Sequence, residues 1–361
     1  MTRNDARPSE DVTGTPPRPP LSVVQVVRSD AFAGVERYIC QVANGLVARG
    51  HHVVAIGGDP QRMRAELGHE IPHHPATSVG QVAVALARQR TASVVHVHMT
   101  AAEAAAWLAH PVQRAPIVAT RHFPGDRGTG TVPRLLARVT SRALARDIAI
   151  SRFVADSIDG PCVLLPNGVL EQPQAPLESA TVLMLQRLTS EKSPEVGLRA
   201  WAASGLGARG WRLVIAGVGD RRHSMDDLVA QLGIDDSVEF VGLVQDTDRL
   251  LDASSILLAP AAAEPFGLSV VEAMAHGLPV VAADGGAHVE TVGGDGMLFP
   301  VGDADAAAAA MTSLADDVAL RQRTGVRLRE RQQRLFSLGG HLDRLEQVYA
   351  TVLSESGRAP R

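Results

Sequence analysis

The chain has 361 residues, of which 45% are hydrophobic, and its formal net charge at pH 7 is −4. This length suffices for two domains with sizeable cores, and the near-balanced charge gives no basic field that would favour nucleic acid. Its two cysteines, Cys40 and Cys162, do not make a disulfide framework or a metal site. The sequence contains no run of about 18 apolar residues, and residues 1–20 are proline-rich without a signal-peptide core, so we expect a disordered tail over 1–20 and a cytoplasmic protein.

The basic residues are strongly biased toward arginine. Of 35 lysine and arginine residues only Lys192 is a lysine, which leaves 34 arginines. Such a bias is typical of a high-GC, actinobacterial-type genome, in which arginine replaces lysine wherever the protein tolerates it. Because arginine is a poor replacement for a compact ammonium charge, a retained lysine is a candidate functional residue. Chance retention is the alternative.

Strands and helices are predicted to alternate through the first half of the chain. Residues 21–27 form a near-continuous β-branched run typical of a buried parallel strand, and a loop containing Gly34 leads into a helix over 35–49. This order opens a nucleotide-binding βαβ unit, although the turn alone explains Gly34 equally well. Further strands are predicted over 53–56, 93–97, 117–120, 148–151 and 163–165, and helices over 79–89 and 101–108.

Three histidines lie in or just after these predicted strands. His96 and His98 share one strand face and resemble a metal pair, but no third ligand is near, so we favour packing or rim positions. His122 directly follows the strand over 117–120. Because open α/β sheets bind ligands beyond the carboxyl ends of their strands, His122 is a candidate functional residue.

Residues 133–150 carry four arginines spaced by four: Arg134, Arg138, Arg142 and Arg146. This spacing predicts a helix with a basic stripe beside an apolar face. The stripe is either a solvated helix face, which we favour, or a contact with an anionic membrane surface or a phosphorylated acceptor.

A proline-interrupted segment divides the chain. Asn167-Gly168 is a strong turn signal and residues 171–178 have no periodic pattern, so we expect the linker there, between domains over 21–170 and 179–338. The segment over 339–361 is expected to form a final helix that packs back on the first domain. The second domain repeats the alternation, with strands predicted over 181–185, 213–216, 238–241, 256–259, 278–282 and 297–299 and helices over 194–203, 224–232, 247–253, 303–314 and 318–335.

Two cations share the loop that follows the first strand of the second domain. Arg187 and Lys192 both lie between the strand over 181–185 and the next helix. At the carboxyl end of a strand, two positive charges meet the requirement of a diphosphate.

Two glutamates, Glu264 and Glu272, lie on either side of a predicted turn and helix start. Glu264 follows the strand over 256–259, Gly267 suits a tight turn, and Ser269 is the expected N-cap, which places Glu272 in the first helical turn. A helix start favours a phosphate, and the two carboxylates are able to bind pairs of sugar hydroxyls. The alternative is that Glu272 only complements the helix dipole and that Glu264 is a solvated loop acid.

Together these features resemble the GT-B glycosyltransferases, and most closely the retaining family 4, the glycosyl transferases group 1. The resemblance extends from the Gly34 loop to the final helix. It implies an α/β fold of two doubly wound, Rossmann-like parallel-sheet domains that face each other across a cleft, the first binding the acceptor and the second the nucleotide sugar. Its most specific segments are Pro166-Asn167-Gly168-Val169, residues 187–194 and residues 264–281.

The resemblance also implies roles for single residues. By similarity, Arg187 and Lys192 bind the donor diphosphate, Glu264 engages the sugar, and His122 lies beside the reaction centre. The family usually has two adjacent glycines where this chain has Ala33 before Gly34. The implied donor-binding residues are Glu272, with the nucleotide ribose, the backbone N–H groups of Phe266, Gly267 and Leu268, the helix start at Ser269, and the Gly34 loop.

We therefore expect transfer of a hexose-type sugar from a UDP or GDP sugar to a hydroxyl group of a natural product, polysaccharide or lipid. The two cations neutralise the leaving diphosphate, and no Asp-x-Asp segment follows a strand at the expected place, so we expect no metal and no cofactor beyond the nucleotide-sugar co-substrate. A GT-B sugar-nucleotide epimerase and a non-catalytic sugar-nucleotide-binding protein are the alternatives. The arginine stripe would be the basis of any peripheral contact with the inner membrane face.

Overall fold

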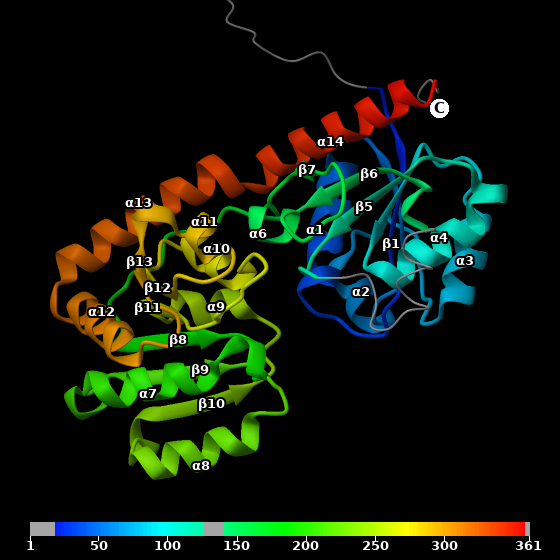
Figure 1. Ribbon diagram of the computed structural model, residues 1–361. Coiled ribbons are helices and arrows are strands. Elements are labelled where there is room, and N and C mark those ends of the chain that lie inside the picture. The colour runs from blue at the N-terminus through cyan, green and yellow to red at the C-terminus, as the bar shows by residue number, and fades with distance from the viewer. Residues whose placement is uncertain (1–18, 126–139, 358–361) are drawn as a thin grey trace, which may run out of the picture.

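The computed structural model describes residues 19–125 and 140–357 and contains two parallel β-sheets flanked by helices (Figure 1). The tail predicted over residues 1–20 lies outside the described residues except for its last two positions. None of the helices in the described part of the chain is both long and apolar enough to cross a membrane.

The N-terminal sheet has seven strands in the order β3-β2-β1-β4-β5-β6-β7, and all of its pairings are parallel. Five of the six residues of β1 are buried, which explains its near-continuous apolar run. The strands are β1 (Ser22–Val27), β2 (His52–Ile56), β3 (His73–His74), β4 (Val94–His98), β5 (Ile117–Arg121), β6 (Leu144–Ala149) and β7 (Val163–Leu164). The helices are α1 (Gly34–Ala48), α2 (Pro60–Glu66), α3 (Val79–Ala87), α4 (Thr100–Gln113) and α6 (Arg152–Ala155).

The C-terminal sheet has six parallel strands in the order β10-β9-β8-β11-β12-β13. The strands are β8 (Thr181–Leu185), β9 (Arg212–Ala216), β10 (Val238–Gly242), β11 (Ile256–Ala259), β12 (Val280–Ala283) and β13 (Met297–Phe299). The helices are α7 (Pro194–Ser204), α8 (Arg222–Leu232), α9 (Thr247–Asp252), α10 (Leu268–Ala275), α11 (His288–Thr291), α12 (Ala304–Asp316), α13 (Val318–Phe336) and α14 (Leu338–Glu355).

Both sheets reverse their strand order at one internal position, between β1 and β4 and between β8 and β11. Open α/β sheets bind ligands in the crevice that such a reversal creates beyond the carboxyl ends of the strands. The loop after β1 leads to Gly34, the loop after β8 carries Arg187 and Lys192, and the loop after β11 carries Glu264. The topology thus places the predicted site residues at both crevices.

The chain crosses between the two domains twice, at one place. The Val169 N–H donates to the Phe336 carbonyl at 2.8 Å, and the Leu338 N–H donates to the Val169 carbonyl at 3.0 Å. From there α14 runs along the N-terminal domain (Figure 1), where Leu345 and Tyr349 are buried in the same core cluster as residues of β1 and α1. The final helix therefore completes the core of the first domain.

The helix predicted from residue 133 is wrong over residues 144–147, because residues 144–149 form β6; the strand predicted over 148–151 covers only the end of β6. In the sheet, β6 lies between β5 and β7, and this position buries its residues Ile148 and Ala149. Arg146 lies on this strand and forms an ion pair with Glu355 of α14 at 2.6 Å. Arg142 is exposed in the preceding turn, and Arg134 and Arg138 lie outside the described residues. The four arginines therefore do not share one helix face.

Candidate active site

A cavity of about 390 Å³ lies between the domains and receives side chains from both. It is lined by every residue that the sequence predicted for the site: Gly34, His122, Arg187, Lys192, Glu264, Phe266, Gly267, Leu268, Ser269 and Glu272. The fold thus brings together segments that are far apart in the sequence.

Lys192 and Glu264 form an ion pair inside this cavity. The Lys192 Nζ lies 2.5 Å from Glu264 Oε2, and each side chain is 13% exposed. Burial acts to raise the pKa of Glu264, but Lys192 and the Gly267 N–H, which donates to Glu264 Oε1 at 3.1 Å, hold it below its ordinary value. The only lysine of the chain is therefore a partly buried charge in the cleft.

The helix that follows Glu264 begins earlier than the sequence predicted. Gly267, with φ +85°, is the N-cap of α10, so Ser269 is not the N-cap and Glu272 falls in the second turn. The reason is that Gly267 adopts the left-handed conformation and turns the chain directly into the helix. The Gly267 N–H, expected to engage the sugar, donates here to the Glu264 carboxylate.

Glu272 faces Arg37, which projects from α1 of the other domain. The Arg37 Nη1 lies 3.7 Å from Glu272 Oε1 and donates to Thr247 Oγ1 at 2.9 Å. Burial raises the pKa of Glu272 to about 7; Arg37 opposes this shift and Asp248 adds to it. An arginine and a carboxyl group thus connect the two domains beside the cleft.

The loop that carries Arg187 is shaped by two glycines after β9. The Leu188 N–H donates to the Val218 carbonyl at 3.0 Å. A Cβ at Gly217 would lie 1.9 Å from the Gln186 carbonyl oxygen, and one at Gly219 would lie 2.1 Å from the Leu188 carbonyl oxygen. The absence of side chains at Gly217 and Gly219 therefore permits close packing of the two loops.

The Arg187 side chain extends from this loop into the solvent-accessible part of the cavity. It is 56% exposed and pairs with Glu191 at 3.0 Å. Its charge is thus more hydrated than that of Lys192, which is 13% exposed.

The backbone of Glu264 is supported by the loop after β12. The Ala287 N–H donates to the Glu264 carbonyl at 2.7 Å, and a Cβ at Gly286 would lie 2.4 Å from the Glu264 backbone nitrogen. His288, which is 1% exposed, lines the same cavity and lies 3.1 Å through Nδ1 from the Ala283 carbonyl. This loop fixes the position from which Glu264 reaches Lys192.

The helix starts of the two domains approach each other at Gly34. A Cβ at Gly34 would lie 3.2 Å from Leu268 Cδ1 across the cleft. The Ala33 N–H donates to Glu36 Oε2 at 2.9 Å, which orders the loop before α1. Each helix start presents N–H groups that lack partners within the helix and attract an anion.

His122 lies on the N-terminal side of the cleft with its ring largely buried. Its Nε2 lies 3.0 Å from His98 Nδ1, and burial lowers the pKa of His122 to about 3. His96 and His98 are fully buried and hydrogen-bonded to other side chains. Within residues 19–125 and 140–357 no group of three or more His, Cys, Asp or Glu side chains is placed to hold a metal ion.

Among the residues that line the cavity, the sequence suggested no site role for Arg37, Asn167, Thr247 and His288, whose side chains are polar or charged. Arg37 offers one signal in retrospect, because a cation close to a helix N-terminus opposes the helix dipole and needs another reason to be there. Asn167 was noted only as part of a turn signal and of a segment that resembles the family, and Thr247 and His288 begin short helices, where the sequence pattern carries no such mark.

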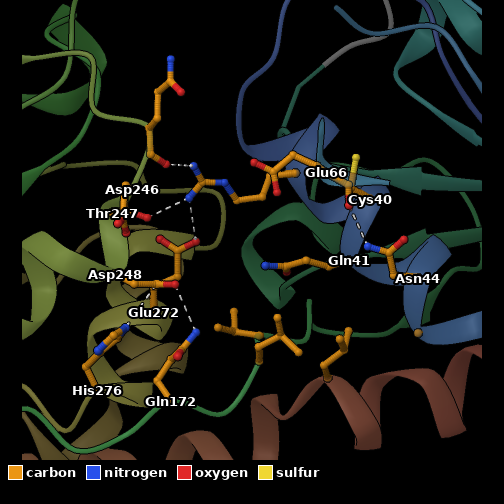
Figure 2. A pocket seen from close by; sticks show the side chains of 16 residues that line it. Cys40, Gln41, Asn44, Glu66, Gln172, Asp246, Thr247, Asp248, Glu272 and His276 are labelled. Carbon is orange, nitrogen blue, oxygen red and sulfur yellow. Dashed lines mark hydrogen bonds and ion pairs between the residues drawn. The ribbon is translucent and has the colours of Figure 1, made fainter. Parts of the chain in front are cut away.

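A second cavity of about 450 Å³ lies on the other side of Arg37 and Glu272, which line both spaces together with Thr247. Figure 2 shows Gln41 and Asn44 of α1 facing Thr247, Asp248 and Glu272 across it. The Arg37 and Glu272 pair therefore forms part of the wall between two interdomain spaces.

Comparison with known proteins matches both halves of the chain to family models. Residues 170–331 match the family described as glycosyl transferases group 1, and residues 32–169 match glycosyltransferase family 4. A phosphatidyl-myo-inositol mannosyltransferase of Mycolicibacterium smegmatis is 30% identical over 360 residues, which cover 90% of this chain and 91% of that protein.

Two other relatives match over shorter regions. An exopolysaccharide phosphotransferase of Streptomyces coelicolor, SCO2592, is 32% identical over 53% of this chain and 21% of that protein. An uncharacterised glycosyltransferase of Haemophilus influenzae is 36% identical over 45% of this chain and 47% of that protein. The chain thus matches less than half the length of either relative.

Solved structures share the fold. Anabaena Alr3699/HepE in complex with UDP-glucose has a TM-score of 0.79 at 18% identity, over 92% of this chain and 100% of that one. AviGT4, a glycosyltransferase involved in avilamycin A biosynthesis, has a TM-score of 0.66 at 20% identity, over 93% of this chain and 98% of that one.

Proposed function

The chain belongs to the family 4 glycosyltransferases and has the GT-B fold, and we propose that it is a retaining, metal-independent enzyme that uses a nucleoside-diphosphate sugar. It transfers a hexose-type sugar to a hydroxyl group of a natural product, polysaccharide or lipid. The nucleotide is UDP or GDP.

The observation that carries this proposal is the pairing of Lys192 with Glu264 beside the start of α10. A developing diphosphate charge needs a preorganised cation in a site of low water content, and Lys192 is such a cation. The α10 N-terminus and Arg187 add positive potential on the same side of the cavity. We infer that the buried carboxyl group of Glu272 accepts hydrogen bonds from the hydroxyls of a nucleotide ribose.

Two relatives point to substrate classes worth testing. The structure of HepE holds UDP-glucose, and the relative from M. smegmatis is named for mannose transfer to phosphatidyl-myo-inositol. The first experiment is a thermal-shift panel of UDP, GDP and ADP sugars, since a bound donor raises the melting temperature by mass action. A donor from this panel then serves in all activity assays.

Three outcomes separate the proposed function from its alternatives. Release of free nucleoside diphosphate only in the presence of an acceptor supports a transferase. Isomerisation of the sugar of the donor without release of nucleoside diphosphate supports an epimerase. If the protein binds the donor but does not turn it over, and Lys192→Ala behaves in the same way, the protein is a binding protein. Retention is tested separately by the anomeric configuration of the product in an NMR spectrum.

The proposed location is the cytoplasm, with peripheral contact at the inner membrane face through the segment around Arg142, whose side chain is exposed. Arg146 is not part of this surface, because it is paired with Glu355. Co-sedimentation with vesicles that contain anionic lipid, compared with neutral vesicles, tests the contact. Equal binding to both, or binding to neither, removes it.

A further inference from the structure

A continuous set of buried hydrogen bonds connects His122 to the final helix. Its members come from β1, β4, β5, the residue that follows β5, and α14, and all are buried in the N-terminal domain. We refer to this set, together with the adjoining pair of Tyr38 and His341, as the histidine network: Gln25, Tyr38, His96, His98, Thr120, His122, His341 and Tyr349.

His341 fixes the direction of its own hydrogen bond with Tyr38, whose ring packs edge-on against His98 and His122. Its Nδ1 lies 2.7 Å from the carbonyl oxygen of Pro166, which only accepts, so Nδ1 carries a proton. Burial lowers the pKa of His341 to about 4, so the ring is neutral and its Nε2 has a lone pair. The Tyr38 hydroxyl, 2.9 Å from this Nε2, must therefore donate to it.

Gln25 fixes the direction of the hydrogen bonds through Tyr349, His96 and Thr120. Its Nε2 donates to the Tyr349 oxygen at 3.3 Å, so the single Tyr349 hydroxyl proton is donated to His96. Thr120 in turn accepts from His96 Nε2 at 2.7 Å. Burial lowers the pKa of His96 to about 3, so its Nδ1 is unprotonated and accepts from the Tyr349 hydroxyl at 2.7 Å.

Gln25 connects Tyr349 to His98, which in turn contacts His122 at the cleft. Its Nε2 donates to the Tyr349 oxygen at 3.3 Å, and its Oε1 accepts from His98 Nε2 at 2.8 Å. The Nδ1 of His98 is then an acceptor, and the partner at 3.0 Å, His122 Nε2, is the donor. The reverse direction would require the Gln25 amide to be turned over, with its oxygen facing Tyr349 and its nitrogen facing His98.

His122 is therefore the Nε2–H tautomer with a lone pair on Nδ1. This Nδ1 has no hydrogen bond within residues 19–125 and 140–357 and is not among the fully buried polar atoms without a partner, so it is accessible from the cavity that His122 lines. A neutral nitrogen of this kind accepts a hydrogen bond from a hydroxyl group and cannot donate one.

We propose that the histidine network holds His122 as a hydrogen-bond acceptor for one sugar hydroxyl in the cleft, with Gln25 and Tyr349 as positioning residues. The inference rests on the proposed glycosyltransferase function for the identity of the ligand as a sugar. According to this proposal, Tyr349 of α14 helps to determine which ring nitrogen of His122 carries the proton.

Nitrogen-15 NMR of the histidine side chains in the full-length protein reads this tautomer directly, with His122→Asn to assign the signals. The expected result is protonation of His122 at Nε2 alone. Tyr349→Phe removes the hydroxyl that orients Gln25, so the Gln25 amide is free to turn over. We therefore expect a mixture of His122 tautomers in this variant. We also expect its kcat/KM for the donor to be about tenfold lower, which corresponds to the loss of one neutral hydrogen bond.

Two threonines provide a matched pair of buried variants. Thr120→Val interrupts the network at another position and is expected to act like Tyr349→Phe, whereas Thr324→Val removes a buried hydroxyl outside it and leaves the tautomer unchanged. Protonation of His122 at Nδ1 in the natural protein, or an unchanged tautomer in both folded network variants, overturns the inference. The tautomer is measured without substrate, so a failure of the proposed function appears separately, as absent transfer with the expected spectrum.

Discussion

Arg37 of the first domain and Glu272 of the second lie 3.7 Å apart across the domain boundary, and the carboxyl group of this pair is only 15% exposed. Because Arg37 also donates to Thr247 Oγ1 and to the Gln245 carbonyl, three contacts to the second domain depend on one side chain. The position of the two domains is thereby coupled to the residue proposed to bind the nucleotide.

Glu272 should make the stability of the protein depend on pH. Its pKa is raised from 4.5 to about 7 on folding, so its contribution to stability is complete below pH 4.5 and is lost as the pH rises toward 7. Glu272→Gln has no charge to bury and should gain up to about 3 kcal/mol relative to the natural protein between pH 5 and pH 8. Urea unfolding of both proteins at pH 5 and at pH 8 measures the difference in their free energies of unfolding. The same difference at both pH values would contradict the prediction.

Removal of Arg37 should loosen the domain arrangement. We expect Arg37→Ala to increase the radius of gyration of the unliganded protein in small-angle X-ray scattering, since its contacts to Thr247 and Glu272 are lost. Arg62→Ala is the matched control, because Arg62 lines the same cavity but stacks on Phe32 of its own domain. Equal scattering from the two variants would show that Arg37 does not hold the domains.

The cations and Glu272 should affect different kinetic constants. Lys192→Ala is expected to lower kcat by about a hundredfold or more, as for other preorganised groups that stabilise developing charge. Arg187→Ala should lower it by less, because Arg187 is half exposed and its charge is more strongly screened. Glu272→Ala should mainly raise the KM for the donor. Steady-state kinetics with the donor from the thermal-shift panel checks all three, and small, equal effects would exclude the assignment.

Lys192→Arg separates charge from shape at the same position. Guanidinium is larger and flatter than ammonium and does not fit the 2.5 Å contact with Glu264, so we expect no rescue of activity. Recovery of more than half of the natural kcat would show that any cation suffices.

Gly219 should not tolerate a side chain. A methyl group there would lie 2.1 Å from the Leu188 carbonyl oxygen, so Gly219→Ala is expected to destabilise the protein by about 1–3 kcal/mol and to displace the Arg187 loop. Gly80→Ala is the control, because a Cβ at this helical position meets nothing within 4 Å and should stabilise the helix by about 0.5–1 kcal/mol. Chemical denaturation of both variants measures the contrast.

The alternation of apolar runs was sufficient to predict two doubly wound domains, because buried parallel strands such as β1 and β11 leave a continuous signal. It failed over residues 144–147, where β6 lies near the sheet edge, has only two buried residues and carries Arg146, the last of four arginines at helical spacing. The seven-residue α2 and the two-residue β3 were not predicted, because segments this short leave too few residues for a periodic pattern.

For the site, the carboxyl ends of the predicted strands, the isolated Lys192 and the resemblance to the family together selected the residues that meet in the cavity. The helix start at Gly267 was missed because serine is the commoner N-cap and the left-handed turn at Gly267 is not visible in composition. Arg37 was missed because its partners lie more than 200 residues away, and only the folded chain brings them together.

The crossing at Val169 and Leu338 has a consequence for biosynthesis. The first domain is not a contiguous stretch of sequence, because Leu345 and Tyr349 of α14 fill part of its core. A ribosome must therefore complete the second domain before the first has all of its core, and a fragment ending near residue 170 leaves an apolar surface on β1 and α1 uncovered. We expect this fragment to become stable when it is coexpressed with a separate α14 peptide, which would cover that surface.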